Sequence, residues 1–397
     1  MKQLSDRLTG LSESETIAMS QRSRELQRQG KDIINLSVGE PDFPSPPYVK
    51  EAAIAAIEDD FTHYPPVPGI PELREAIVAK FKRDNNLEYK PSQIVVSTGG
   101  KQALSNAIYA LVNEGDEVII PSPYWVSYPA MAQLAGGKSV FVYAGIDQDF
   151  KMTPQQLEDA ITPKSKVLLL NSPCNPTGSV YSLEELKALA IVLERHPNVF
   201  VISDEIYEYI NYEVPHHSMA EIPSLKERVI IVNGVSKGYA MTGWRIGYMA
   251  APEWVASACS RLQGQYTSGT STISQKAALA AIEGPLEYTR SMVDAFRRRR
   301  ELVVKMANEI PGLKNNNPAG AFYLFPNVSS FFGKSFNGHT IEDARDLSFY
   351  LLEQAYVATV SGTAFGNKNC IRFSYATSDE LLVEAMKRIK KALAALK

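Results

Sequence analysis

Short apolar runs alternate with helical patterns from about residue 46 to residue 283, and this alternation restricts the chain to few architectures. Several runs are apolar at every position, as expected of central strands covered on both faces. Strands that alternate with crossover helices form a mostly parallel sheet. We therefore predict an α/β fold around a seven-stranded sheet covered by helices, with strands at 94–97, 117–120, 138–143, 167–171, 199–203, 229–233 and 246–250.

The pattern changes after about residue 290, where one long helix precedes short strands expected at 321–325, 357–360 and 371–375. Helices are expected at 341–354 and, at the C-terminal end, at 378–396. At the other end of the chain, the segment 16–29 reads as an amphipathic helix. We predict that residues 46–290 form a large domain. Residues 1–45 are expected to join residues 291–397 in a smaller α+β domain.

The composition argues against several classes of protein. The net charge of -3 gives no global field that would draw the chain to nucleic acid or to an anionic membrane. Its cysteines, Cys174, Cys259 and Cys370, lie far apart, so we expect neither a metal site nor a disulfide framework. No window approaches about 18 uninterrupted apolar residues, and the first residues lack the apolar core of a signal peptide. These features predict a cytoplasmic protein.

A lysine with the setting of a nucleophile follows the strand expected at 229–233. Lys237 lies in a Ser/Gly-rich loop, where partial burial would lower its pKa toward that of a reactive amine. Ser236 and Arg245 add a hydroxyl and a planar cationic group, which are donors that suit a phosphate. An ordinary surface loop with an incidental lysine is the alternative interpretation of this segment.

Polar residues also follow other expected strands. Asp204 and Tyr207 come after one strand, and Asn175 lies in a turn after another. Open α/β sheets bind ligands at the carboxyl ends of their strands, so these side chains should face one crevice. Gly99 and Gly100 precede a helix whose free N–H groups suit an anion. Each motif taken alone also fits a common cap or turn.

Eight motifs occur in one order along the chain: Gly39-Glu40-Pro41-Asp42, Tyr64, Gly99-Gly100-Lys101, Pro123-Tyr124-Trp125, Asn175-Pro176-Thr177-Gly178, Asp204-Glu205-Ile206-Tyr207, Ser236-Lys237 and Gly243-Trp244-Arg245. With this order, and over nearly its whole length, the chain resembles the class I aminotransferases, which are fold type I pyridoxal-phosphate enzymes. Among these it is most similar to the bacterial aspartate aminotransferases. The resemblance implies a fold type I PLP-dependent transferase, with residues 46–290 as the cofactor-binding domain.

The resemblance also implies a role for each matching residue. Lys237 would hold pyridoxal 5′-phosphate as a Schiff base and then move the substrate α-proton as base and acid. Asp204 would keep the pyridine nitrogen protonated, which makes the ring an electron sink. Tyr207 and Asn175 would hydrogen-bond the phenolic oxygen of the ring, and Trp125 would stack on the ring face.

The cofactor phosphate has its own set of implied ligands: Gly99, Gly100, Lys101, Ser236 and Arg245. Tyr64 is expected to reach the phosphate of the neighbouring subunit, so the resemblance implies a homodimer with active sites at the subunit interface. The chain departs from the family pattern at Gly234, where many relatives have a serine that binds phosphate. Other donors would then replace the hydroxyl that is missing at this position.

The substrate would be held at both of its ends. Arg372 matches the family arginine that binds the α-carboxylate with a bidentate fork, and the backbone of Gly39 would approach the same group. Trp125 and Asn175 would also line the substrate site. In the bacterial aspartate enzymes a lysine and a Ser/Thr pair bind the distal carboxylate, and the matching positions here are Lys101, Ser14 and Thr16. A cation at that place favours a dicarboxylate substrate.

The implied reaction moves an amino group between L-aspartate and 2-oxoglutarate, giving oxaloacetate and L-glutamate. Within the family, transamination of prephenate, aromatic amino acids, alanine or kynurenine is the alternative. Ser12-Glu13 stands where relatives active on prephenate have a basic residue, which weakens that case. A PLP-dependent carbon–sulfur lyase or decarboxylase on the same fold is a second alternative. A transcription regulator would need a further DNA-binding domain, for which the chain has no room.

Overall fold

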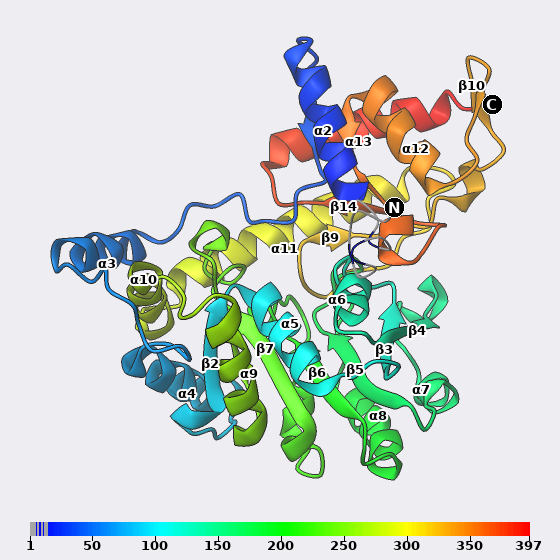
Figure 1. Cartoon of the computed structure of the whole chain (residues 1–397). Coiled ribbons are helices and arrows are strands. Elements are labelled where there is room, and N and C mark those ends of the chain that lie inside the picture. The colour runs from blue at the N-terminus through cyan, green and yellow to red at the C-terminus, as the bar shows by residue number, and fades with distance from the viewer. Residues whose placement is uncertain (1–4, 6–7, 9–10, 12–14) are drawn as a thin grey trace.

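The computed structural model describes the chain except residues 1–4, 6–7, 9–10 and 12–14, and it does not describe the side chains of residues 15–18 and 20. A central sheet dominates the structure (Figure 1). Its strands lie in the order β2 (Ile94–Thr98), β8 (Ile246–Ala250), β7 (Val229–Gly234), β6 (Phe200–Asp204), β5 (Ser165–Asn171), β3 (Glu117–Ser122) and β4 (Lys138–Tyr143).

All seven expected strands are present in this sheet. Strand β8 is antiparallel to both of its neighbours, and the other paired strands are parallel. Every residue of β7 and β8 is buried, whereas the edge strand β4 has exposed positions. The prediction of a mostly parallel seven-stranded sheet is confirmed.

Helices cover both faces of the sheet and account for its wholly apolar central strands. On one face, Ile230 and Val232 of β7 pack with α5 (Gly100–Leu111), α6 (Tyr128–Leu134) and α9 (Glu253–Tyr266). On the other face, Val229 and Ile231 belong to the core formed with α3 (Pro47–Glu58), α4 (Pro71–Asn85), α7 (Pro154–Ala160), α8 (Leu183–Arg195) and α10 (Thr272–Glu283). Adjacent residues of β7 therefore point to opposite faces of the sheet and belong to two different hydrophobic cores.

A second group of elements combines segments from the first 40 residues and from the C-terminal part of the chain (Figure 1). Strand β1 (Ile34–Asn35) pairs in parallel with β12 (Val357–Ala358), and β13 (Val360–Ser361), β14 (Ile371–Ser374) and β9 (Tyr323–Leu324) form an antiparallel sheet. The helices of this group are α2 (Glu15–Arg28), α11 (Glu287–Asn308), α12 (Ala344–Tyr350) and α13 (Asp379–Ala394). The division into domains with limits at residues 46 and 290 stays a prediction.

Two expected strands of this group are shorter in the structure. The run 321–325 is a strand at Tyr323–Leu324 alone, and the run 357–360 is divided at the buried Thr359. Each half pairs differently, since β12 meets β1 whereas β13 meets β14. The apolar pattern located this chain segment, but it did not show that the segment changes partner.

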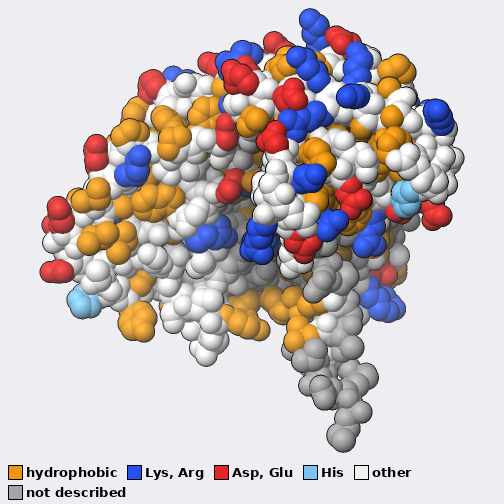
Figure 2. Space-filling view, turned by 90° about the horizontal axis from the view of Figure 1, so that it is seen from above, with side chains coloured by type: hydrophobic (Ala, Val, Ile, Leu, Met, Phe, Trp, Pro, Cys, Tyr) orange, Lys and Arg blue, Asp and Glu red, His pale blue; other side chains and the backbone are white. Residues whose placement is uncertain are grey.

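The face of the molecule seen in Figure 2 carries charged side chains of both signs, with hydrophobic side chains exposed among them. Ile54 and Ile57 of α3 are exposed by more than half, and Tyr64 is 96% exposed. In the part of the chain that the structure describes, no helix is both long and apolar enough to cross a membrane.

Candidate active site

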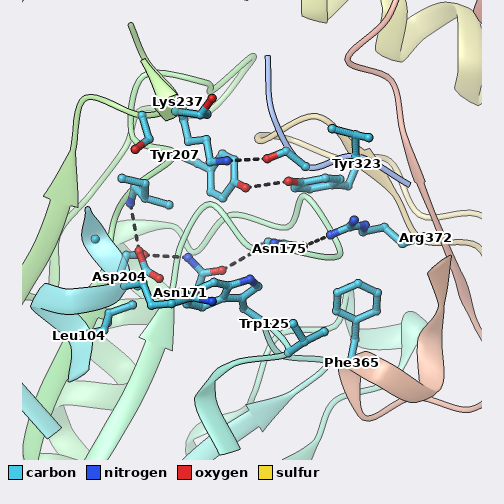
Figure 3. A pocket seen from close by; sticks show the side chains of 18 of the residues that line it. Leu104, Trp125, Asn171, Asn175, Asp204, Tyr207, Lys237, Tyr323, Phe365 and Arg372 are labelled. Atoms are coloured by element: carbon cyan, nitrogen blue, oxygen red, sulfur yellow. Dashed lines mark hydrogen bonds between the residues drawn. The ribbon is translucent and has the colours of Figure 1, made fainter. Parts of the chain in front are cut away.

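A cavity of about 450 Å³ lies at the carboxyl ends of the central strands. Strand β6 ends at Asp204 and β7 ends three residues before Lys237, while α5 starts at Gly100 just after β2. The cavity brings together most of the predicted site residues: Gly39, Gly100, Lys101, Trp125, Asn175, Asp204, Tyr207, Ser236, Lys237, Arg245 and Arg372. Figure 3 shows Lys237 and Tyr207 on one side of this cavity and Trp125 on the opposite side.

Four predicted residues are not part of the cavity wall as described. Gly99 lies just beyond the wall, where any side chain would collide with the Arg245 guanidinium. Tyr64 projects from the surface and faces no group of its own chain's cavity. Ser14 lies outside the described residues, and so does the side chain of Thr16, whose backbone belongs to α2.

The Lys237 amine is held inside the cavity. Its Nζ donates a hydrogen bond to the carbonyl oxygen of Gly39, and it lies 5.8 Å from the centre of the Tyr207 ring. Burial lowers the pKa of Lys237 to about 8, since the charged form loses hydration there. At neutral pH this amine is therefore closer to its nucleophilic form than a surface lysine would be.

Asp204 is a buried carboxyl group that accepts two hydrogen bonds. The Tyr128 hydroxyl donates to its Oδ2 at 2.7 Å, and the backbone N–H of Ile206 donates to its Oδ1 at 3.3 Å. Burial raises the pKa of Asp204 to about 6. No basic side chain among the described residues forms an ion pair with it, so the carboxylate is suited to a ligand that brings a positive charge.

An anion-binding corner lies beside these two residues. The amino end of α5 starts at Gly100, and Ser236 and Arg245 line the same wall. Arg245 is fixed in part by donating from Nη1 to the carbonyl oxygen of Thr242 at 2.9 Å. Free helix N–H groups, a hydroxyl and a guanidinium together suit a phosphate.

The departure from the family pattern at Gly234 has a steric basis. A Cβ atom at this position would lie 2.8 Å from the carbonyl oxygen of Ile246 and 2.9 Å from the Cα of Gly247. The close approach of β7 and β8 therefore excludes a serine here in this backbone. Ser236, two residues further along the chain, carries a hydroxyl and lines the cavity.

Arg372 forms a cationic seat on the far wall. Its Nη1 donates to Asn175 Oδ1 at 2.9 Å and its Nη2 donates to the carbonyl oxygen of Ser37 at 2.7 Å. The guanidinium lies between the rings of Tyr323 and Phe365, at 4.5 and 4.8 Å from their centres. Burial lowers the pKa of Arg372, and this penalty on the charged form is relieved when a carboxylate binds.

Lys101 provides a second cation. Its Nζ lies 4.9 Å from the centre of the Trp125 ring. Loss of hydration lowers the pKa of Lys101, and the positive charge of the nearby Arg245 lowers it further. No ion pair to Lys101 is present among the described residues. An ammonium that lies against an aromatic ring and has no carboxylate partner among the described residues is suited to an acidic ligand.

Comparison with known proteins identifies the family. Residues 31–389 match the family model described as aminotransferase class I and II. The chain belongs to this family. It is an aminotransferase, and the class that its motifs predicted is confirmed.

Individual relatives match this aminotransferase over its whole length. The aspartate/prephenate aminotransferase of Cereibacter sphaeroides is 50% identical over 396 residues, which cover 99% of both chains. A bifunctional aspartate aminotransferase and glutamate/aspartate-prephenate aminotransferase of Petunia hybrida is 47% identical, over 99% of this chain and 83% of the relative.

Solved structures agree with the sequence relatives. The crystal structure of an aspartate aminotransferase from Rhizobium meliloti aligns with a TM-score of 0.97 and 43% identity over 100% of each chain. Aspartate aminotransferase from Thermus thermophilus with maleate has a TM-score of 0.92 and 42% identity, covering 99% of this chain and 100% of that one. The expected fold type I architecture is thus confirmed.

Several residues of the site were not foreseen from the sequence: Ser37, Asn171, Tyr128, Tyr323 and Phe365. Tyr128 is the first residue of α6, and its backbone N–H donates to the carbonyl oxygen of Trp125 at 3.0 Å. Tyr323 lies in an apolar segment, where an aromatic residue reads as core, and Phe365 lies in the short turn Gly362–Phe365. Nothing in their local sequence separated them from the packing residues beside them.

Proposed function

We propose that this aminotransferase uses pyridoxal 5′-phosphate to move the amino group between L-aspartate and 2-oxoglutarate, giving oxaloacetate and L-glutamate. The observation that carries the proposal is that one cavity holds an enclosed amine, an unpaired buried carboxyl group and an anion corner. These are Lys237, Asp204 and the wall formed by Gly100, Ser236 and Arg245. Each feature alone is unremarkable, but each matches a different group of this cofactor.

The residues present fit that cofactor. The Asp204 carboxyl, which lacks a cationic partner, would hold the protonated pyridine nitrogen, and the anion corner would hold the phosphate. The Lys237 amine would form the covalent link. Bound in this way, pyridoxal 5′-phosphate supplies an electron sink for the α-carbon of the substrate.

The side chains around the ring position have separate tasks. Lys237 would move the proton at the substrate α-carbon, because its lowered pKa lets the amine both accept and return a proton near neutral pH. Tyr207 and Asn175 would donate hydrogen bonds to the phenolic oxygen. Trp125, on the opposite side from Lys237, would cover the ring and exclude water (Figure 3).

Two cations support a dicarboxylic substrate. Arg372 would bind the α-carboxylate that amino acids and 2-oxo acids share. Lys101 would bind the distal carboxylate, with Ser14 and Thr16 as further predicted ligands. The relatives are named for aspartate, and one solved relative carries maleate, which is also a dicarboxylate.

Prephenate is the second candidate substrate, and the names of the relatives favour it. Aspartate/prephenate aminotransferases at 44–50% identity cover nearly the whole chain. Prephenate also carries two carboxylates, so the same pair of cations would suit it. The acidic Glu13, where a basic residue was expected for this activity, argues that prephenate is the poorer substrate.

We further propose a cytoplasmic homodimer with the active sites at its interface. A hollow of about 400 Å³ next to the cavity shares Lys101 and Arg245 with it, and Tyr109 and Tyr266 line this hollow. Tyr64 is too exposed to serve its own cavity, and a second copy would offer it a polar partner. Tyr64 would then contact the phosphate held by the partner subunit.

The experiment is an assay of the purified protein after it has been loaded with the cofactor. Aspartate and 2-oxoglutarate are supplied, and oxaloacetate is followed, while prephenate, phenylalanine and cystathionine are tested in parallel. Rapid formation of oxaloacetate supports the proposal. Activity on another substrate with little on aspartate would contradict the substrate assignment, and pyruvate and ammonia from cystathionine would favour the lyase.

A further inference from the structure

Tyr323 lies where three parts of the site meet, yet the proposed function gives it no task. Its hydroxyl oxygen lies 2.8 Å from that of Tyr207, and its ring centre lies 4.5 Å from the Arg372 guanidinium carbon. Figure 3 shows this tyrosine between the two residues. The group that would contact the cofactor oxygen and the group that would bind the substrate carboxylate thus share one neighbour.

The contact between the tyrosines joins two separate sheets. Tyr207 follows β6 of the central sheet, whereas Tyr323 belongs to β9, which pairs with β14, the strand that carries Arg372. Both rings are almost fully buried and meet edge to face, with centres 5.9 Å apart and planes at 80°. Rings packed in this way have little freedom to turn, so the hydroxyl pair has a fixed geometry.

The proton count gives the hydrogen bond a direction. Each hydroxyl has one proton to donate. If Tyr207 donates to the cofactor oxygen, it must accept from Tyr323, and it has no other hydrogen-bond partner among the residues that the structure describes. A hydroxyl that accepts a hydrogen bond becomes a stronger donor, because the two bonds polarise each other.

The backbone at Gly39 fixes Tyr323 from a third side. A Cβ atom on Gly39 would lie 2.9 Å from the Tyr323 hydroxyl oxygen, so the glycine backbone packs directly against this group. Phe365 holds the other face of the Arg372 guanidinium. The tyrosine is therefore held by packing on several sides and can in turn hold its two neighbours.

We propose that Tyr323 is a positioning residue, whose hydroxyl directs the Tyr207 hydroxyl toward the cofactor and whose ring supports the Arg372 guanidinium. The inference rests on the proposed function, because it requires a cofactor oxygen beside Tyr207. The charged groups that face Tyr207 are Asp204 and Lys237 from the central sheet and Arg372 from β14. All three are kept in the variants that test the idea.

Two substitutions separate the two tasks. Tyr323→Phe removes the hydroxyl and keeps the ring, whereas Tyr323→Leu removes both. Tyr375→Phe is the matched control, since Tyr375 is as deeply buried, its hydroxyl lies 3.3 Å from that of Tyr212, and it does not line the cavity. The absorbance of the cofactor in each loaded protein is titrated against pH, and KM is measured for aspartate and for 2-oxoglutarate.

Tyr323→Phe is expected to raise the midpoint of the absorbance titration by about half to one pH unit, because a weakened Tyr207 donor stabilises the deprotonated state less. Its KM values should stay close to those of the wild type. Tyr323→Leu should in addition raise both KM values by about tenfold, as the cation–π support of Arg372 is lost. Tyr375→Phe should change neither quantity.

Two results would overturn the inference, and they differ in what else they affect. The inference alone is overturned if the wild type titrates normally and Tyr323→Phe leaves the midpoint of the titration unchanged. It is also overturned if Tyr375→Phe shifts this midpoint as much as Tyr323→Phe does. A wild-type protein that shows no pH-dependent cofactor absorbance overturns the proposed function together with the inference.

Discussion

Arg372 donates a hydrogen bond to Asn175 at 2.9 Å and thereby connects residues 197 positions apart in the chain. Asn175 lies in the turn after β5 of the central sheet, whereas Arg372 lies on β14. The proposed carboxylate clamp is thus joined to a residue proposed to contact the cofactor. Substrate binding and cofactor orientation are therefore expected to depend on one another.

Arg372→Lys should raise KM for aspartate and for 2-oxoglutarate alike, since both carry the α-carboxylate. A lysine keeps the charge but loses the bidentate fork. The loss of one charge-assisted hydrogen bond, about 1.5–3 kcal/mol, corresponds to about a 10- to 100-fold increase. Steady-state kinetics with each substrate checks this, and an effect confined to one of them would remove Arg372 from the shared clamp.

Lys101→Met should raise KM for aspartate far more than KM for alanine. The substitution keeps the aliphatic chain beside Trp125 and removes the cation proposed for the distal carboxylate, which alanine lacks. KM for aspartate is expected to rise by about 10- to 100-fold. The matched control is Lys166→Met, because Lys166 also lies against an aromatic ring, that of Phe200, and does not line the cavity. Equal effects of Lys101→Met on both substrates would contradict the assignment.

Asp204→Asn should lower kcat by about 10²–10³-fold or more, because a neutral amide cannot balance the positive pyridine nitrogen. The amide keeps nearly the same shape and can still accept from Tyr128. Tyr128→Phe should cause a smaller loss, since the carboxylate remains and has lost one donor. Single-turnover rates of the loaded variants measure both effects, and near-normal turnover by Asp204→Asn would contradict the role of this carboxylate.

The pKa of Lys237, lowered by burial to about 8, predicts how fast the cofactor-free protein captures pyridoxal 5′-phosphate. The neutral amine is the nucleophile, so the capture rate should rise with pH up to about 8 and then level off. A lysine with its ordinary pKa of about 10.4 would give a rate that rises over two further pH units. Stopped-flow absorbance measures this profile, and Lys237→Ala, which should bind the cofactor without a covalent link, is its control.

If Tyr64 contacts the phosphate held by the partner subunit, a dimer of two differently defective subunits should regain activity. Lys237→Ala and Tyr64→Ala homodimers are expected to be inactive and weakened, respectively. In a hybrid of the two, one site has both defects and the other has a native Lys237 with a native Tyr64. Mixing after mild dissociation should therefore raise the activity above that of either parent, and a simple average of the parents would place Tyr64 outside the partner's site.

The residues foreseen from the sequence are mostly those at the ends of strands. Asp204, Asn175 and Lys237 each follow an apolar run, so chain connectivity alone predicted that they face one crevice. Tyr128 and Tyr323 were missed because they act on other side chains and lie in apolar patterns typical of core. The steric reason for Gly234 was also hidden, since it depends on the approach of β8 and not on local sequence.

Transfer of the amino nitrogen from aspartate to 2-oxoglutarate distinguishes an aminotransferase from a lyase on the same fold. The loaded protein is given aspartate labelled at its amino nitrogen together with unlabelled 2-oxoglutarate, and the products are separated by mass spectrometry. We expect the label to appear in glutamate in step with oxaloacetate, and we expect Lys237→Ala to abolish this transfer. Label released as ammonia, or retained in aspartate while another amino acid is consumed, would contradict it.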